Sequence, residues 1–366
     1  MQHINKIFAI ALLSFCLAAC HKDSPAPDGS SQTGGSEPAI ADTLRGVALI
    51  LNEGSWGNNN ASLSLLLNDT TGEVINNWFA QKNGRGLGDV AQDMVAYGSK
   101  IYITVWNSNS LEVIDRNTSR SRRIDLGDLS PRYIATHGDK LYISCYNPNC
   151  VIRIDTASLK LEASCAVGDY NPEGVAVAGG KLFVASNKAG LPDGSYAYDN
   201  KVYAIDLASF ANPTPVTVGT NPNKVLVFND QYVVVNCFGD YNASTYSYSN
   251  PKVAAINVSS LEATLYDENL EDMAVYNNRV IGFSTSNGET MYRTLSGSPS
   301  AFTVSTSYMD NGVEPYKINI NPANGDEYLT TTGGYIANGD VRFTAADHSR
   351  SWSTQAGMLP SKVIFL

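Results

Sequence analysis

The feature that most constrains this chain is an internal repeat of 40 to 50 residues. Each unit contains an apolar strand, a tight turn, a second apolar strand, a polar loop and a third strand that ends in Asp or Asn. The second strands begin at spacings of 40, 41, 50, 48 and 48 residues, at Lys100, Lys140, Lys181, Gln231, Arg279 and Glu327. Short β-branched and aromatic strands at this period are typical of the four-stranded blades of a β-propeller. The repeat therefore predicts an all-β fold.

The turns between first and second strands support this prediction. They are rich in Gly, Asn and Asp, which tolerate the positive φ angles of a tight hairpin. No helical period of useful length competes with the strands. The six turns are Gly98-Ser99, Gly138-Asp139, Gly179-Gly180, Asn229-Asp230, Asn277-Asn278 and Asn324-Gly325.

A seventh unit is divided between the two ends of the repeat region. Residues 47–51 have the pattern of a second strand, but no first strand precedes them. The C-terminal residues 360–366 begin with Pro and resemble the first strands that begin at Pro131, Pro172 and Pro222. Pairing of the C-terminal strand with the N-terminal blade would close the ring and leave no exposed edge strand. We predict a seven-bladed β-propeller over residues 42–366.

The N-terminus has the pattern of an export signal. A short basic start, an apolar stretch from Ile7 to Leu17 and small residues before Cys20 predict a signal peptide over residues 1–19. Cys20 follows Leu-Ala-Ala, as in a bacterial lipobox, so we expect Cys20 to carry a lipid; the alternative is an ordinary cleaved signal with a chance Cys. Residues 20–41 form a polar, Pro-, Ser- and Gly-rich stretch that predicts a flexible tether. We expect contact with the membrane, the bacterial outer membrane, only through this anchor.

Composition excludes some partners and leaves the cysteines open. The chain has 35 acidic and 25 basic residues, which argues against nucleic-acid binding. Cys145 and Cys150 flank a predicted four-residue loop, and the sequence is equally compatible with a disulfide and with two unpaired thiols. Cys165 and Cys237 are expected in the core. No metal-binding CxxC pairs occur, and we predict no metal and no cofactor.

One face of the predicted propeller carries unusual residues. The loops between second and third strands share this face with the connections between blades, and two of them, residues 187–200 and 238–251, are enlarged and rich in Tyr. Exposed Tyr and Trp with amide side chains favour a binding surface, although Asn and Gly also serve tight loops. The candidate ligand-binding residues are Trp56, Asn58, Asn60, Asp89, Gln92, Trp106, Asn107, Arg132, Tyr146, Asn147, Tyr170, Asn187, Asn236, Phe238, Tyr241, Tyr246, Tyr316 and Tyr335.

The sequence offers little catalytic chemistry. Beyond the predicted signal peptide only His21, His137 and His348 remain, and no HExxH or GxSxG motif occurs. Carboxylates such as Glu53, Asp89 and Glu173 are expected near the channel mouth, so a lactonase or lyase is the less favoured alternative. We predict a binding protein and no catalytic residues.

Several segments resemble the YncE-like, surface-layer-type propeller lipoproteins of Bacteroidetes. They are residues 52–54 (Asn-Glu-Gly), 60–64, 87–92 (Leu-Gly-Asp-Val-Ala-Gln) and 130–134 (Ser-Pro-Arg-Tyr-Ile). The resemblance to the BtuG-type branch implies a cell-surface lipoprotein that binds cobalamin and delivers it to a TonB-dependent outer-membrane transporter. A corrinoid has a flat ring, peripheral amides and a phosphate, which suit Tyr and Trp faces, Asn and Gln side chains and a basic residue. A glycan or a peptide would suit the same surface, and a structural envelope role is the further alternative.

Overall fold

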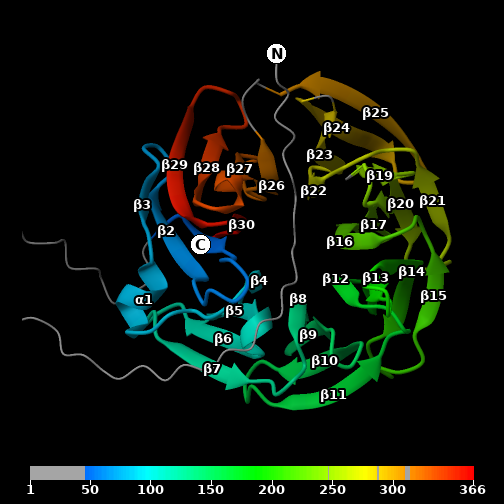
Figure 1. The fold of residues 1–366 in the computed structure, drawn as a ribbon, viewed down its shortest axis with the longest axis horizontal. Coiled ribbons are helices and arrows are strands. Elements are labelled where there is room, and N and C mark those ends of the chain that lie inside the picture. The colour runs from blue at the N-terminus through cyan, green and yellow to red at the C-terminus, as the bar shows by residue number, and fades with distance from the viewer. Residues whose placement is uncertain (1–45, 246, 287, 310–313) are drawn as a thin grey trace, which may run out of the picture.

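The computed structural model describes residues 46–366, except 246, 287 and 310–313. The predicted signal peptide (1–19) and tether (20–41) lie outside the described residues, as do the lipidation site Cys20 and the candidate Tyr246. Within the described part of the chain, seven four-stranded antiparallel sheets surround a central axis, and one further sheet has two strands. Figure 1 shows the sheets side by side as the blades of a closed ring. The prediction of a seven-bladed β-propeller is confirmed.

Blades 1 to 4 follow one another along the chain, each with its first strand innermost. Blade 1 contains β4 (Ala91–Tyr97), β5 (Lys100–Val105), β6 (Ser110–Asp115) and β7 (Ser121–Asp125). Blade 2 contains β8 (Pro131–His137), β9 (Lys140–Cys145), β10 (Cys150–Asp155) and β11 (Leu161–Ala166). Blade 3 contains β12 (Pro172–Ala178), β13 (Lys181–Gly190), β14 (Tyr196–Asp206) and β15 (Thr214–Thr217). Blade 4 contains β16 (Pro222–Asn229), β17 (Tyr232–Cys237), β20 (Lys252–Asn257) and β21 (Ala263–Tyr266).

Blades 5 to 7 complete the ring. Blade 5 contains β22 (Asp272–Tyr276), β23 (Arg279–Ser286), β24 (Glu289–Ser298) and β25 (Ala301–Tyr308). Blade 6 contains β26 (Pro315–Ile320), β27 (Glu327–Thr331), β28 (Asn338–Thr344) and β29 (Ser351–Met358). Blade 7 contains β30 (Pro360–Phe365), β1 (Ala48–Asn52), β2 (Ser62–Asn68) and β3 (Glu73–Ile75). The two-stranded sheet pairs β18 (Asp240–Asn242) with β19 (Ser247–Ser249) in the loop of blade 4.

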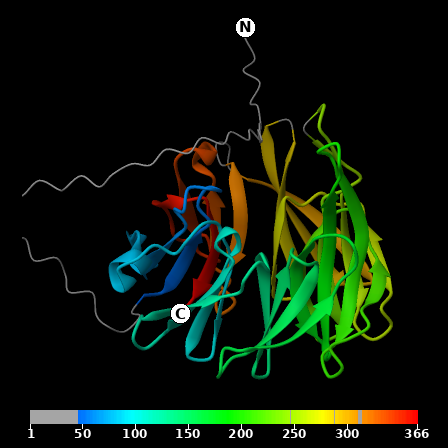
Figure 2. The ribbon, with the colours of Figure 1, turned by 60° about the horizontal axis from the view of Figure 1, so that its bottom comes forward.

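The two ends of the repeat region pair as predicted. Strand β30 lies antiparallel to β1, with Ala48 opposite Phe365 and Leu51 opposite Lys362. In both ribbon views the dark-blue β1 and the red C-terminal strands lie side by side (Figure 1, Figure 2). The last strand, β30, is therefore the innermost strand of blade 7, which also contains the first strand, β1. The pairing of β30 with β1 closes the ring.

The Asp or Asn that ends each third strand has a structural role. In blade 1, Asp115 Oδ1 accepts hydrogen bonds from the backbone N–H groups of Asn117 and Thr118, each at 2.9 Å. Ser119 then adopts a left-handed conformation with φ of 59°. Short acidic and amide side chains stabilise such turns because they bond the backbone two or three residues ahead. The same arrangement recurs in blades 2, 3 and 4, at Asp155 with Leu159, Asp206 with Phe210 and Asn257 with Leu261.

Side-chain hydrogen bonds between inner strands tie neighbouring blades together. Asp93 Oδ2 on β4 accepts from the Ile134 N–H on β8 at 3.0 Å. Asp272 on β22 bonds Ile318 on β26 in the same way at 2.9 Å, and Asn319 bonds Val363 on β30 at 3.0 Å. These bonds satisfy buried backbone donors that no strand partner reaches, so they fix the spacing of the blades around the axis.

Apolar side chains fill the space between the blades. Between blades 6 and 7, buried Tyr328, Phe343 and Val363 pack with half-buried Trp352, whose ring stacks on Phe343 with centroids 5.0 Å apart. A short helix that the sequence analysis did not predict, α1 (Trp78–Asn83), buries Trp78 and Phe79 beside blade 7. Among the described residues, no helix combines the length and the apolar character that crossing a membrane requires.

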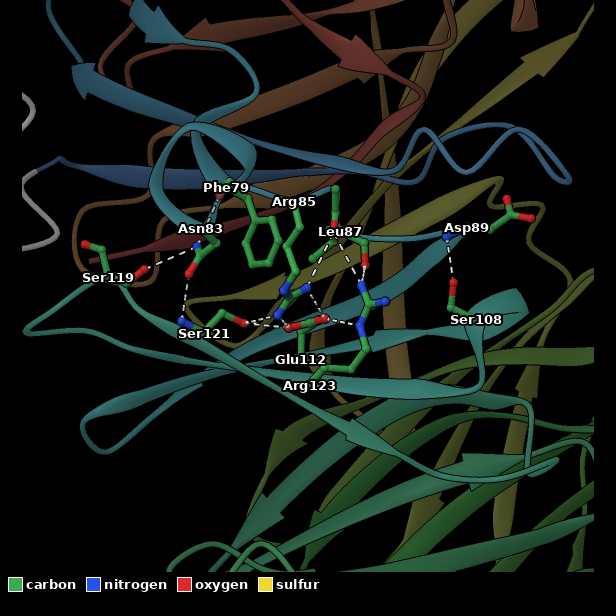
Figure 3. Close-up of polar contacts among 11 residues, drawn as sticks. Phe79, Asn83, Arg85, Leu87, Asp89, Ser108, Glu112, Ser119, Ser121 and Arg123 are labelled. Carbon is green, nitrogen blue, oxygen red and sulfur yellow. Dashed lines mark hydrogen bonds and ion pairs between the residues drawn. The ribbon is translucent and has the colours of Figure 1, made fainter. Parts of the chain in front are cut away.

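A buried ion cluster secures the connection into blade 1 (Figure 3). The fully buried Glu112 on β6 binds Arg85 through both carboxylate oxygens, at 2.7 and 2.8 Å, and also pairs with Arg123 on β7. Burial of Glu112 opposes its ionisation, but the hydrogen bonds from Arg85, Ser121 and Arg123 outweigh this effect and lower its pKa. The cluster is structural, since it holds the chain before β4 against β6 and β7.

Two local expectations were wrong in detail. The Asn229-Asp230 turn contains no positive φ angle; instead Asn229 Oδ1 accepts from the backbone of Gln231 and Tyr232. The enlarged segment 187–200 is not an open loop, because β13 and β14 continue their pairing through Lys188 opposite Tyr198 to Gly190 opposite Tyr196.

The four cysteines of the described residues are unbridged. Cys145 and Cys150 lie directly opposite each other on β9 and β10, and both are buried free thiols. Cys165 and Cys237 are buried among apolar side chains of two interblade clusters, as expected.

Candidate functional site

A cleft of about 490 Å³ opens on the loop face of blades 1 to 4. We call it the aromatic cleft. Six aromatic side chains line it, from η1 (Trp106–Ser108), the loops and the extended hairpins: Trp106, Tyr146, Tyr196, Tyr198, Phe238 and Tyr248. Four amide side chains also line it, Asn171, Asn187, Asn221 and Asn223, and so do three charged side chains, Arg132, Glu173 and Lys188.

Arg132 and Glu173 form the polar base of the cleft. Both follow the proline that begins an inner strand, Arg132 on β8 and Glu173 on β12. The Arg132 guanidinium binds the Glu173 carboxylate through Nε at 3.2 Å and Nη2 at 3.1 Å. Tyr146 donates its hydroxyl to the same carboxylate, and Arg132 also donates to Gln92. Burial raises the pKa of Glu173, while Arg132 opposes that rise.

Aromatic rings hold the Arg132 guanidinium from two sides. Its central carbon lies 4.7 Å from the ring centroid of Tyr146 and 5.0 Å from that of Trp106. Cation–π contacts of this kind orient a guanidinium without consuming its N–H donors. The guanidinium of Arg132 is therefore held in one orientation beneath an aromatic surface, paired with Glu173.

Lys188 places a second positive charge on the cleft wall. It lies on the extended part of β13, with Nζ 4.3 Å from the ring centroid of Tyr196. Burial lowers the pKa of Lys188, although Glu173 counteracts this effect. Within the described chain Lys188 forms no ion pair of its own, so its ammonium group can bind an anionic group of a ligand.

Aromatic rings from the loop of blade 4 form another part of the cleft wall. Tyr248 on β19 packs against Phe238, with centroids 5.6 Å apart, and against Tyr241 on β18, at 5.1 Å. Tyr248 is nevertheless 49% exposed. A large aromatic surface left in solvent beside a cleft is typical of a binding site.

The four amides divide into two pairs. Asn187 donates to Asn221 Oδ1 at 2.6 Å and to the Pro222 carbonyl at 3.1 Å, and Asn221 donates to the Gly239 carbonyl at 3.2 Å. These two are committed to holding blade 3 against blade 4. In contrast, the side chains of Asn171 and Asn223 make no hydrogen bond to any described residue, so both amides remain available to a ligand.

Five of the predicted site residues meet in the cleft: Trp106, Arg132, Tyr146, Asn187 and Phe238. Gln92 and Tyr241 do not line the cleft but contact residues that do. Gln92 accepts a hydrogen bond from Arg132, and the ring of Tyr241 packs against Tyr248. Asn147 follows Tyr146 in the loop of blade 2, and Tyr170 lies half-buried before β12; neither lines the cleft.

The structure places the other candidates elsewhere. Asp89 accepts from the Gly57 N–H and from Asn107 Nδ2 at 2.6 Å, and so links the loops of blades 7 and 1. Asn60 accepts from the Ser55 N–H at 2.7 Å within its own loop. Asn236 is buried and bonds the Leu270 carbonyl at 2.7 Å. Asn58 and the 66% exposed Trp56 lie in the loop of blade 7.

Tyr316 and Tyr335 form a separate pair over blade 6. Tyr316 donates to Glu53 Oε2 at 2.9 Å, and its ring meets Tyr335 of η2 (Gly333–Tyr335) edge to face. Burial raises the pKa of Glu53, and Lys317 is the main group that opposes the rise. This pair borders the channel but not the aromatic cleft.

The sequence analysis did not select eight of the thirteen cleft residues as candidates: Asn171, Glu173, Lys188, Tyr196, Tyr198, Asn221, Asn223 and Tyr248. Two signals were present in the sequence. Asn171 and Asn221 both precede the proline that begins an inner strand, and therefore sit at the same place in successive blades. Tyr196 and Tyr198 alternate along one strand, which places both on the same side of it.

The cleft contains one carboxylate, and it is paired. Across residues 46–366, leaving aside the positions not described, no three His, Cys, Asp or Glu side chains are grouped so as to hold a metal ion.

Comparison with solved structures supports the propeller fold. The chain is similar to a quinonprotein alcohol dehydrogenase-like protein from Bacteroides thetaiotaomicron, with a TM-score of 0.58 and 13% identity over 88% of this chain and 78% of the other. It is also similar to Kuenenia stuttgartiensis hydrazine synthase, with a TM-score of 0.54 and 17% identity over 68% and 74% of the two chains. The dihydro-heme d1 dehydrogenase NirN gives a TM-score of 0.54 and 9% identity over 90% and 77%.

These neighbours include propeller enzymes, but at such low identity the likeness shows the fold alone. No family model matches the sequence, and no curated protein matches it either.

Proposed function

We propose that this chain is a ligand-binding propeller whose aromatic cleft holds a flat organic molecule that carries amides and an anionic group. The observation that carries the proposal is the combination of six aromatic side chains with two uncommitted amides and the Lys188 ammonium in one cleft. Aromatic faces contact a planar ligand, Asn171 and Asn223 bond its polar edge, and Lys188 binds its charge. Arg132 and Glu173 neutralise each other and keep the base of the cleft rigid.

The candidate ligand is a corrinoid such as cobalamin. A corrinoid combines a planar ring, amide side chains and a phosphate, which are the three features that the cleft residues complement. Because the cleft has a volume of about 490 Å³, it would hold one edge of so large a molecule, and the rest would lie over the loop face. The resemblance of residues 52–54, 87–92 and 130–134 to the YncE-like and BtuG-type lipoproteins supports the same ligand. In this proposal the chain is anchored by a lipid on Cys20 at the outer membrane and delivers the corrinoid to a TonB-dependent transporter.

Binding is favoured over catalysis by the state of the cleft carboxylate. Glu173 is held by Arg132 and by the hydroxyl of Tyr146, so it is not positioned to take a proton from a ligand. Cyanocobalamin bound in the cleft should be released with its visible spectrum unchanged.

Calorimetric titration with cyanocobalamin tests the proposal. We expect saturable binding that the Tyr248→Ala variant weakens at least tenfold, because the ring of Tyr248 faces the ligand. Tyr308→Ala is the matched control, since Tyr308 is 51% exposed but lies on the outer strand β25. Lys188→Met should weaken cyanocobalamin more than it weakens cobinamide, which lacks the nucleotide.

Two results would overturn the corrinoid assignment. The first is an absence of heat and of retention in equilibrium dialysis at micromolar cyanocobalamin. The second is saturable binding of neutral oligosaccharides that Tyr248→Ala abolishes while cyanocobalamin is not bound, which would assign the cleft to a glycan. Incorporation of labelled palmitate in bacteria, and its loss in Cys20→Ser, tests the anchor separately.

A further inference from the structure

A second cavity lies at the other end of the central channel. It has a volume of about 300 Å³ and is lined by the inner strands β4, β8, β12 and β16 together with Lys362 of β30. We call it the far mouth. It contains Thr136, Val177 and Val227, which lie next to the hairpin turns of their blades, whereas the aromatic cleft contains the second residues of the same strands, Arg132, Glu173 and Asn223. The two sites therefore occupy opposite ends of the channel.

The far mouth is apolar at its opening and charged at its inner end. Its apolar lining includes Val95, Val177, Leu226 and Val227, and Val227 is 40% exposed. At the inner end it shares Asp93, Tyr133, Lys224 and Lys362 with a narrower cavity of about 50 Å³ that also borders Lys317. An apolar wall that ends in charged groups is suited to an amphiphilic small molecule.

Three lysines meet two aspartates and Glu53 at this inner end. Lys224, Lys317 and Lys362 occupy the same place in their strands as Asp93 and Asp272, one residue before a buried apolar residue. Lys224 binds Asp272 at 2.8 Å, and Lys362 lies 3.3 Å from Asp93. Among the described residues Lys317 forms no ion pair, and its Nζ lies over the ring of Tyr316, 4.7 Å from the centroid.

Both aspartates at this end are engaged, whereas lysine donors remain. Asp93 accepts from the N–H groups of Met94 and Ile134 and forms an ion pair with Lys362. Asp272 accepts from the Ile318 N–H and from Lys224. Each lysine ammonium has three N–H donors, so most of the ammonium donors have no partner.

Ser361 adds another unused donor. Its side chain lines the narrower cavity and is 7% exposed, and its hydroxyl has no hydrogen-bond partner among the described residues. Burial raises the pKa of the neighbouring Glu53 carboxyl, and Lys317, the Tyr316 hydroxyl and the nearby Ser361 hydroxyl oppose that rise. Glu53 offsets part of the positive charge of the lysines. Within the described chain it accepts no hydrogen bond from Lys224 or Lys362.

We propose that the far mouth binds a small organic anion, whose oxygens accept hydrogen bonds from Lys224, Lys317 and Lys362 while its apolar body contacts Val177, Leu226 and Val227. At ~30 Å³ for each water-sized group, the cavity holds about ten non-hydrogen atoms. The ligand class is therefore a monocarboxylate with a short branched or aromatic body. This site is independent of the ligand proposed for the aromatic cleft.

Calorimetric titration with phenylacetate tests this site, with phenylacetamide as the neutral molecule of the same shape and inorganic phosphate as the head group alone. We expect phenylacetate to bind at least tenfold more tightly than either. Val227→Glu, which adds a negative charge at the opening, should weaken phenylacetate at least tenfold. Val304→Glu is the matched control, because Val304 is 39% exposed on the outer strand β25, and it should leave binding unchanged.

Lys317→Gln is the second variant, since Lys317 has no ion pair whose loss would leave a described carboxylate unpaired. It should weaken phenylacetate at least tenfold with an unchanged circular dichroism spectrum. Equal binding of phenylacetate and phenylacetamide, or binding that Val227→Glu leaves unchanged, would overturn the proposal. Phosphate binding as tight as phenylacetate would overturn the role of the apolar wall.

Discussion

Removal of two methyl groups from Val363 tests whether β30 closes the ring. Val363 is buried between blades 6 and 7 in a cluster with Tyr328, Phe343 and Trp352, and its N–H donates to Asn319. The Val363→Ala substitution keeps the hydrogen bond and removes only packing. The energetic cost is therefore set by the apolar contact that joins the last strand to its neighbours.

The magnitude has two parts. Loss of two buried methyl groups at about 0.8 kcal/mol each costs about 1.6 kcal/mol. The space that they leave adds about 1 kcal/mol, if a cavity of ~40 Å³ remains at about 24 cal/mol per Å³. We expect the free energy of unfolding to fall by about 2 to 3 kcal/mol in Val363→Ala. The half-exposed Val304 on β25 should lose less than about 1 kcal/mol in the matched Val304→Ala variant.

Urea unfolding followed by tryptophan fluorescence measures both variants, because Trp352 packs in the same cluster as Val363. Hydrogen exchange adds a local readout: amides of β1 and β30 should lose protection in Val363→Ala before those of blades 2 to 4. Equal shifts of the urea midpoint for the two variants, or unchanged protection of β1, would refute the role of β30 as the closing strand.

Three further predictions concern buried polar groups. Glu112→Gln should lower the free energy of unfolding by about 2 to 3 kcal/mol at pH 7. Because the pKa of Glu112 is lowered in the folded state, the ionised carboxylate stabilises the fold above its ordinary pKa of 4.5, and this stabilisation is lost as the pH falls through the folded pKa. Urea unfolding at pH 3.5 should therefore show a smaller difference between the variant and the wild type. Arg132→Met leaves Glu173 buried without its cation and should raise the pKa of Glu173 further, so the variant should melt closer to the wild type at pH 5 than at pH 8; a difference that does not change with pH would contradict this. Asn187→Ala removes the bonds to Asn221 and to the Pro222 carbonyl and should cost about 1 to 3 kcal/mol in urea unfolding, and a loss below 0.5 kcal/mol on that scale would show that the amide pair does not hold blades 3 and 4 together.

The fold was predictable because each blade is specified by local signals. A third strand that ends in Asp115, Asp155 or Asp206 leads into a turn that this side chain itself stabilises. A proline begins each of the inner strands β8, β12, β16, β26 and β30 and marks where the inner strand of a blade starts. Such signals are local. The number of blades and the pairing of the two chain ends therefore had to be inferred from the periodicity of the repeat.

The aromatic cleft was only partly predictable, because an amide serves structure and binding equally well. Asn187 and Asn236 are of a residue type that often contacts ligands, yet the side chain of each donates a hydrogen bond to a backbone carbonyl beyond its own blade. Asn171 and Asn223 were not selected, and they are the amides left uncommitted. The difference depends on which blade lies next to which, and no local pattern encodes that.

The extended hairpin was missed for another reason. Its polar residues resemble a loop, since β13 and β14 leave the core beyond Asn187 and no longer need an apolar face. Pairing there continues only because the strands are already aligned by the blade beneath. Lys188, Tyr196 and Tyr198 consequently line the cleft from a hydrogen-bonded hairpin.

The alternation of the inner strands links the two ends of the channel. On β16, Asn223 lines the aromatic cleft and the next residue, Lys224, lines the far mouth. Blade 3 approaches this strand at Gly174, where a Cβ would lie 2.5 Å from the Asn223 carbonyl oxygen and 2.8 Å from the Val225 nitrogen. Any side chain at Gly174 would therefore push β16 away from β12 and displace Asn223 and Lys224 together. The close packing of blades 3 and 4 at this glycine thus sets the geometry of both sites, although the two sites share no ligand-facing residue on β16.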